Sequence, residues 1–219
     1  MVEVATSLLS IDEEKSIQTI YDIEVAGTDY FHIDVMDGKF VKRDTIELMR
    51  KYTEYIKQIA NTKIEVHLMV KDVLNFVKAY IDMDVDCIMF HVEACRSESE
   101  IADIIKYLKD NNTKVGLVIN PKTEINKIFN YLPYIHRVLV MSVEPGEGGQ
   151  KFIENSIGKI QELNKYIYEN GYEVDIEVDG GVNNENAELL SDAGANIIVA
   201  GSYIANSNNY KEAIESIRK

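Results

Sequence analysis

The segment His32-Ile33-Asp34-Val35-Met36 carries chemically reactive side chains at every second position. Alternate residues of a β-strand share a face, so His32, Asp34 and Met36 would lie on one side and the two aliphatic residues on the other. An imidazole and a carboxylate facing a protein interior need a metal ion, a proton relay or a substrate to satisfy them. The segment therefore predicts a functional site on the polar face of a strand.

Two more residues with metal-ligating side chains, His67 and Asp179, end other apolar runs. With His32 and Asp34 they offer two imidazoles and two carboxylates, a set that suits Zn²⁺, Fe²⁺, Mn²⁺ or Co²⁺ and leaves positions open for substrate oxygens. A buried hydrogen-bonded network without metal is the alternative. We favour a divalent metal because four ligand-type residues fall at three strand ends.

The two aspartates also have the character of an acid–base pair. Asp34 and Asp179 would face each other across a pocket, so that one could remove a proton from a carbon while the other returns one. A nearby divalent cation would stabilise the enediolate formed between these steps. The alternative is that both residues are only ligands. His91 and Glu93 have the spacing of rival ligands, or they surround the ligands as hydrogen-bonding partners.

Methionines and glycines lie beside these residues. Met36, Met69 and Met141 are expected to point inward, either as core filling or, as we favour, as a water-poor cover over the metal. Glycine-containing loops follow the last three predicted strands, at residues 145–150, 179–181 and 200–202. Exposed backbone N–H groups in such loops bind phosphate without lysine or arginine. The loops therefore predict a phosphate site.

The elements that position these residues alternate regularly along the chain. Eight apolar runs rich in Val and Ile are expected to be strands: residues 2–8, 30–36, 64–70, 87–92, 114–120, 137–143, 174–179 and 196–200. Each precedes a segment with helical spacing: residues 12–25, 44–60, 72–81, 97–109, 124–131, 154–168, 184–192 and 208–218. This alternation predicts a parallel sheet, and eight repeats favour a single-domain (β/α)8 TIM barrel over residues 1–219. A doubly wound open sheet is the alternative.

Charge and composition narrow the classes of partner. The net charge is −14, from 23 basic and 37 acidic residues, which argues against binding to nucleic acid or to anionic membranes. We see no signal peptide and no apolar run of about 18 residues that could span a membrane. Cys87 and Cys95 match neither a zinc spacing nor a disulfide framework, so we expect reduced thiols and a cytoplasmic location.

Over nearly its whole length the sequence resembles the ribulose-phosphate 3-epimerase family. The matching segments are residues 7–10, 32–38, 40–41, 66–69, 91–93, 120–123, 140–143, 145–146, 148–150, 176–182 and 199–202. The resemblance implies a (β/α)8 barrel of the pentose phosphate pathway that inverts C3 of ribulose 5-phosphate to give xylulose 5-phosphate. Members of this family are commonly oligomeric, which favours a homo-oligomer, and no organic cofactor is implied.

The resemblance also assigns roles to individual residues. It implies that His32, Asp34, His67 and Asp179 bind the divalent metal and that the two aspartates are the acid/base residues. It further implies contacts between the substrate and Ser7 and His67, and an enediolate shielded by Met36, Met69 and Met141. The phosphate would be held by Gly148, Gly149, Gly180, Gly181, Gly201 and Ser202.

The sequence departs from the family pattern beside the expected pocket. Residues 42–45 are Lys-Arg-Asp-Thr where the family usually has Pro-Asn-Leu-Thr, and Glu144 and Glu147 replace its usual Asn and Phe. Carboxylates near a phosphate site would repel it unless they point to solvent. These departures leave open an epimerase of a hexulose phosphate such as allulose 6-phosphate. A non-catalytic barrel that binds a phosphorylated sugar is a third possibility, which the opposed aspartates argue against.

Overall fold

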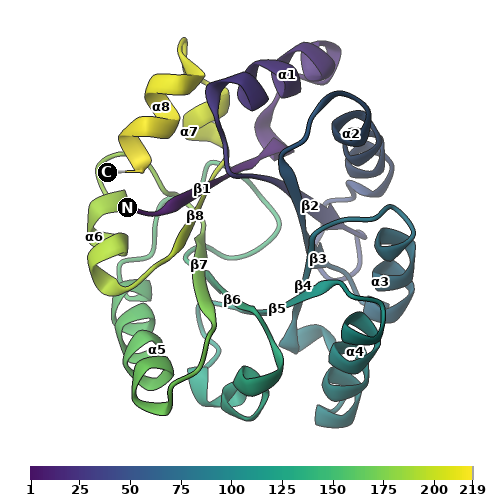
Figure 1. Cartoon of the computed structure of the whole chain (residues 1–219), viewed down its shortest axis with the longest axis vertical. Helices are drawn as coiled ribbons and strands as arrows, with labels where there is room; N and C mark the ends of the chain where they lie inside the picture. Colours follow the sequence, from purple (N-terminus) through teal and green to yellow (C-terminus); the bar gives the residue numbers. More distant parts are fainter. Residues whose placement is uncertain (219) are drawn as a thin grey trace.

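The computed structural model describes residues 1–218, which form a closed barrel of eight parallel strands (Figure 1). Each strand pairs with the next along the chain, and β1 pairs with β8 to close the sheet. The predicted barrel is confirmed and the open sheet is excluded. The strands are β1 Glu3–Ser7, β2 Tyr30–Met36, β3 Lys63–Met69, β4 Cys87–His91, β5 Lys114–Ile119, β6 Arg137–Met141, β7 Asp175–Asp179 and β8 Ile197–Ala200.

Helices form a ring outside the barrel (Figure 1). The α-helices are α1 Ser16–Ala26, α2 Ile46–Ile59, α3 Val73–Ile81, α4 Glu98–Asp110, α5 Ser156–Asn170, α6 Ala187–Ala193, α7 Ser202–Ala205 and α8 Tyr210–Ile217. Short 3₁₀ helices are η1 Leu8–Ser10, η2 Glu13–Lys15, η3 Val92–Ala94, η4 Ile125–Lys127 and η5 Phe129–Tyr134. Among residues 1–218 we find no helix with the length and apolar character needed to cross a membrane.

One helix prediction was wrong and one helix was missed. Residues 124–131, expected as an α-helix, instead contribute to η4 and η5. Pro133 lies inside η5, where it lacks an N–H and disfavours α conformation at the preceding residue. The single-turn helix α7 follows β8 directly and is too short for its periodicity to be recognised.

Successive residues of each strand point alternately outward, toward the helices, and inward, toward the barrel axis. The apolar residues on these two faces form separate clusters. Ile33 and Val35 of β2 point outward into the main core, where the barrel packs against the helices. Tyr30, on the opposite face of the same strand, belongs to a smaller cluster inside the barrel with Met89 and Leu139. The polar residues His32 and Asp34 share this inward face. The fold therefore directs the chemically reactive side of β2 toward the barrel axis.

Candidate active site at the carboxyl ends of the strands

A pocket of about 310 Å³ lies at the carboxyl ends of the strands. It collects predicted residues from across the chain: Ser7, Asp34, Met36, Met69, Met141, Gly148, Gly149, Asp179, Gly180, Gly181, Gly201 and Ser202. His32 and His67 are fully buried next to this lining. The structure therefore brings together every residue that the sequence predicted for the site.

The four predicted metal ligands form one compact group. His32, Asp34, His67 and Asp179 each offer one ligand atom, and these atoms all lie within 4.8 Å of one another. Nδ1 of His67 lies 3.2 Å from Asp34 Oδ1 and 3.8 Å from Asp179 Oδ2, and Nε2 of His32 lies 3.4 Å from Asp34 Oδ1. Such close oxygen and nitrogen lone pairs repel one another unless protons or a cation lie between them.

Burial and neighbouring charges drive the pKa values of the two aspartates apart. Burial opposes ionisation of Asp34, but the charge of the neighbouring His32 outweighs burial and holds the pKa of Asp34 well below the usual range. Burial and the Asp34 carboxylate raise the pKa of Asp179 to about 7. Near neutral pH the pair therefore holds one ionised carboxylate and one that is partly protonated.

The two histidines also have opposite electrostatic surroundings. Burial lowers the pKa of His67 to about 4, so its imidazole is neutral near pH 7. Burial also disfavours the charged form of His32, but the neighbouring carboxylates of Asp34, Glu177 and Glu65 outweigh burial and raise its pKa well above the usual value.

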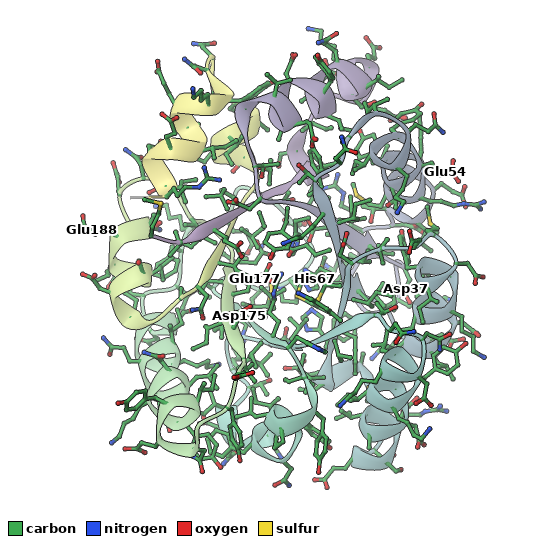
Figure 2. All side chains as sticks on the ribbon, in the orientation of Figure 1. Asp37, Glu54, His67, Asp175, Glu177 and Glu188 are labelled. Carbon is green, nitrogen blue, oxygen red and sulfur yellow. The ribbon has the colours of Figure 1, made fainter. Side chains whose placement is uncertain are left out.

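A buried ionic layer lies one step deeper along the barrel axis, and the sequence reading missed it. Nδ1–H of His32 donates to Glu65 Oε1 at 2.7 Å, and the Arg137 guanidinium donates to Glu65 and, at 2.9 Å, to Glu177. Figure 2 shows His67 and Glu177 inside the ring of strands, whereas Glu54 lies outside. Each glutamate stands two residues before a predicted ligand, His67 or Asp179, and that spacing was the available signal.

This layer also explains a second group of possible metal ligands. His32, Glu65 and Glu177 satisfy the same geometric condition as the four-residue group above them. The Arg137 guanidinium, however, bridges the two glutamates and supplies the positive charge that they require. We therefore assign this layer to support of His32 rather than to metal binding.

Asp34 is held at both its side chain and its backbone. The Ser7 hydroxyl donates to Asp34 Oδ2 at 2.6 Å, and the Thr45 hydroxyl donates to the Asp34 carbonyl at 2.6 Å. Thr45 also accepts a hydrogen bond from the Met36 N–H at 2.9 Å. Thr45 thus fixes the end of β2, a role that sequence reasoning did not assign to it.

His91 and Glu93 lie on the far side of His67 from the ligand group. Nε2 of His91 is 2.8 Å from Nε2 of His67, and Nδ1 of His91 is 3.3 Å from Glu93 Oε2. His67 therefore presents Nδ1 to the ligand group and Nε2 to His91. This geometry favours the interpretation of His91 and Glu93 as partners of a ligand over that of rival ligands.

The glycine loops need the conformational freedom of glycine. Gly181 has φ +66°, and a Cβ there would lie 2.5 Å from the Phe152 backbone nitrogen. Gly180 has φ +124°, and its Cβ would meet Val143 at 2.5 Å. A side chain at either position would displace the backbone of the neighbouring loops. These two glycines let the backbone of the loop form part of the pocket wall.

The unexpected glutamates, Glu144 and Glu147, line the pocket but are exposed to solvent. The Glu144 carboxylate pairs with Lys122 at 2.9 Å and its side chain is 55% exposed, and Glu147 is also exposed. The Gln150 amide donates to the carbonyl oxygens of Glu144 at 2.7 Å and Glu147 at 2.8 Å, which closes this loop on itself. Solvent and Lys122 therefore reduce the electrostatic repulsion that we expected between these carboxylates and a bound phosphate.

The family model and two relatives that are similar in sequence agree on one family. Residues 3–205 match the model of the "Ribulose-phosphate 3 epimerase family". Ribulose-phosphate 3-epimerase of Bacillus subtilis (strain 168) is 38% identical over 219 residues, covering 100% of this chain and 99% of that protein. The enzyme of the same name from Methanocaldococcus jannaschii is 39% identical over 219 residues, covering 100% of this chain and 91% of that protein.

Solved structures with little sequence identity share the barrel. A 3-keto-L-gulonate-6-phosphate decarboxylase from Vibrio cholerae superimposes with a TM-score of 0.75 at 12% identity, covering 99% of this chain and 95% of that one. A 3-hexulose-6-phosphate synthase gives a TM-score of 0.70 at 13% identity, covering 99% and 98%. At such low identity these similarities support the fold alone.

Proposed function

We propose that this chain, which belongs to the ribulose-phosphate 3-epimerase family and is thus an isomerase, inverts C3 of D-ribulose 5-phosphate to give D-xylulose 5-phosphate. The observation that carries the proposal is that Asp34 and Asp179, from β2 and β7, reach one pocket with their pKa values displaced in opposite directions. Groups displaced in this way are suited to act as base and acid on the same carbon.

An unpartnered buried nitrogen in the four-ligand group supports the proposal of a divalent cation. Nε2 of His32 is buried without a hydrogen-bond partner among residues 1–218, although it belongs to the four-ligand group. An unpartnered buried ring nitrogen is costly, and a metal would satisfy it. We therefore propose that His32, Asp34, His67 and Asp179 hold Zn²⁺, Fe²⁺, Mn²⁺ or Co²⁺. When bound, this cation would offset the negative charge that develops on the substrate oxygens.

The two aspartates would perform the proton transfers. The ionised Asp34 removes the C3 proton of one epimer, and the protonated Asp179 delivers a proton to the opposite face of the resulting enediolate. In the reverse direction the two carboxylates exchange roles. The Ser7 hydroxyl, which donates to Asp34 Oδ2, orients the Asp34 carboxylate for this transfer.

The remaining lining residues would exclude water and hold the phosphate. Met36, Met69 and Met141 lie in the pocket wall beside the two aspartates, and their thioethers cannot protonate an enediolate. The backbone N–H groups of the glycine loops would bind the phosphate, with Gly148, Gly149, Gly180, Gly181, Gly201 and Ser202 as the contacts. This arrangement supplies a local anion site within a protein of net charge −14.

Incubation of the metal-loaded protein with ribulose 5-phosphate in D₂O tests the proposal. We expect xylulose 5-phosphate to appear together with deuterium at C3, as followed by NMR. Deuterium incorporated only in a parallel incubation with allulose 6-phosphate would assign the activity to a hexulose phosphate instead. Absence of exchange with either ketose phosphate, despite bound metal, would identify a sugar-phosphate-binding barrel instead.

A further inference from the structure

A continuous chain of hydrogen bonds runs from the ligand group to the loop after β5. It passes from His67 through His91 to Glu93, whose second oxygen accepts hydrogen bonds from the Asn120 N–H, at 2.9 Å, and from the Thr123 hydroxyl. The rings of His67 and His91 are tilted by only 28°, with centroids 5.0 Å apart. His91 is fully buried, and the ring of Phe40 lies against it with centroids 4.9 Å apart.

The direction of this chain decides which nitrogen of His67 carries its proton. The contact between the two Nε2 atoms needs one proton, from either His67 or His91. If His91 supplies it, the neutral His67 ring carries its own proton on Nδ1, the atom that faces Asp34 and Asp179. If His67 supplies it, Nδ1 keeps a free lone pair toward the ligand group. Only the second direction leaves His67 able to bind a cation.

We propose that Glu93 and His91 are positioning residues that hold the proton of His67 on Nε2 and so prepare Nδ1 as a metal ligand. The Glu93 carboxylate can only accept, so it binds the Nδ1–H of His91, and Nε2 of His91 then accepts from His67. This inference rests on the proposed metal site and extends it beyond the four ligands. Partners of ligating histidines typically change metal affinity by about 10–100-fold when they are altered.

The isosteric substitution Glu93→Gln gives the sharpest test because Asn120 determines how the new amide would lie. The Asn120 N–H is a donor and requires the amide oxygen, so the amide NH₂ would face Nδ1 of His91. His91 would then accept at Nδ1 and donate from Nε2, which reverses the chain and places the His67 proton on Nδ1. Glu93→Ala, in contrast, removes the acceptor without reversing the chain, because water can replace it.

The experiment measures Zn²⁺ affinity by calorimetry and the His67 tautomer by long-range ¹H–¹⁵N NMR of the metal-free proteins. We expect Glu93→Gln to weaken Zn²⁺ binding about 10–100-fold, and by more than Glu93→Ala does. We also expect the His67 proton on Nε2 in the wild type and shifted toward Nδ1 in Glu93→Gln. A general structural role predicts the opposite order of affinities, since Gln preserves the shape that Ala removes.

Glu124→Gln, the same chemical change at an exposed position of the β5 loop, is the matched control and should bind Zn²⁺ as the wild type does. Thermal unfolding of each variant checks that it is folded. Equal tautomer populations in the wild type and Glu93→Gln would overturn the inference, and so would a Glu93→Gln affinity equal to that of Glu93→Ala. A wild type that binds no divalent cation would refute the proposed metal site, while the NMR comparison would still decide the role of Glu93.

Discussion

Asp34 on β2 and Asp179 on β7 bring their carboxylates together at the carboxyl ends of the strands. One oxygen of each carboxylate lies within 4.8 Å of one oxygen of the other. Nδ1 of His67 lies close to both carboxylates, at 3.2 Å from Asp34 Oδ1 and 3.8 Å from Asp179 Oδ2. Burial and the nearby Asp34 carboxylate raise the pKa of Asp179, whereas the charge of His32 lowers that of Asp34. A pair of similar side chains thereby acquires two different protonation states.

The first prediction concerns the acid–base pair. Asp179→Asn should lower kcat for ribulose 5-phosphate by about 10²–10⁴-fold, because the amide can neither give nor accept the proton. Circular dichroism should show an unchanged fold. Asp175→Asn, an exposed position at the amino end of the same strand, is the control and should remain fully active. Normal turnover by Asp179→Asn would refute the two-carboxylate mechanism.

The second prediction concerns the phosphate loop after β7. Gly181→Ala should raise KM strongly, because its Cβ would lie 2.5 Å from the Phe152 backbone nitrogen and would move that loop. Gly171→Ala is a matched control, since Gly171 has the same φ of +66° but no heavy atom within 4 Å of the added Cβ. The control should lose only about 1 kcal/mol of stability. Equal KM values for the two variants would argue against a phosphate role for the loop.

The third prediction concerns the buried ionic layer. Arg137→Met should lower the free energy of unfolding by about 3–5 kcal/mol, because it removes the guanidinium that bridges the buried Glu65 and Glu177. Urea denaturation measures this loss. Arg50→Met, which removes an exposed arginine paired with Glu54, should cost at most about 1 kcal/mol. Similar losses in the two variants would show that the layer contributes no more than a surface pair.

The fourth prediction concerns the loop that follows β2. The buried Asp37 carboxylate accepts hydrogen bonds from the N–H groups of Lys39, Phe40 and Lys71 at 2.8–2.9 Å. Burial opposes its ionisation, but these backbone bonds outweigh burial and lower its pKa. In Asp37→Asn the amide NH₂ must face at least one of these donors, so the variant should lose about 1–3 kcal/mol of stability near pH 7.

The lowered pKa of Asp37 determines how the stability difference between wild type and Asp37→Asn should change with pH. Because the folded-state pKa is lowered, the carboxylate stabilises the protein above the unfolded-state pKa of about 3.9, and this contribution is lost as the pH falls through the folded-state value. Urea unfolding should therefore show the difference between wild type and Asp37→Asn shrinking at acid pH. A difference that stays constant or grows on acidification would contradict the assignment.

Much of the fold followed from local patterns in the sequence. Residues 30–36 were predicted as a strand with His32 and Asp34 on one face, and β2 has these bounds and this orientation. The alternation is readable because the outward residues, Ile33 and Val35, pack against helices while the inward ones do not. Eight such runs, each followed by a helical segment, allow few arrangements other than a barrel.

The ionic layer and the loop after β5 were harder to predict for physical reasons. Glu65 and Glu177 read as isolated charges in apolar runs, and their partner Arg137 lies on a third strand, so the group exists only once the barrel has closed. The 3₁₀ helices η4 and η5 share the residue types of an α-helix, and Pro133 alters the outcome there. The direction of the His67–His91–Glu93 chain likewise depends on contacts made across strands.

The most direct test of the account is a time course in D₂O that starts from ribulose 5-phosphate and is analysed at low conversion. Two carboxylates on opposite faces of C3 predict that the first xylulose 5-phosphate formed carries deuterium at C3, because the incoming proton comes from a group in exchange with solvent. The ribulose 5-phosphate that remains should still be unlabelled at that stage. A product that retains the original C3 proton would show that one group moves the proton between faces, and would contradict the central role of the Asp34–Asp179 pair.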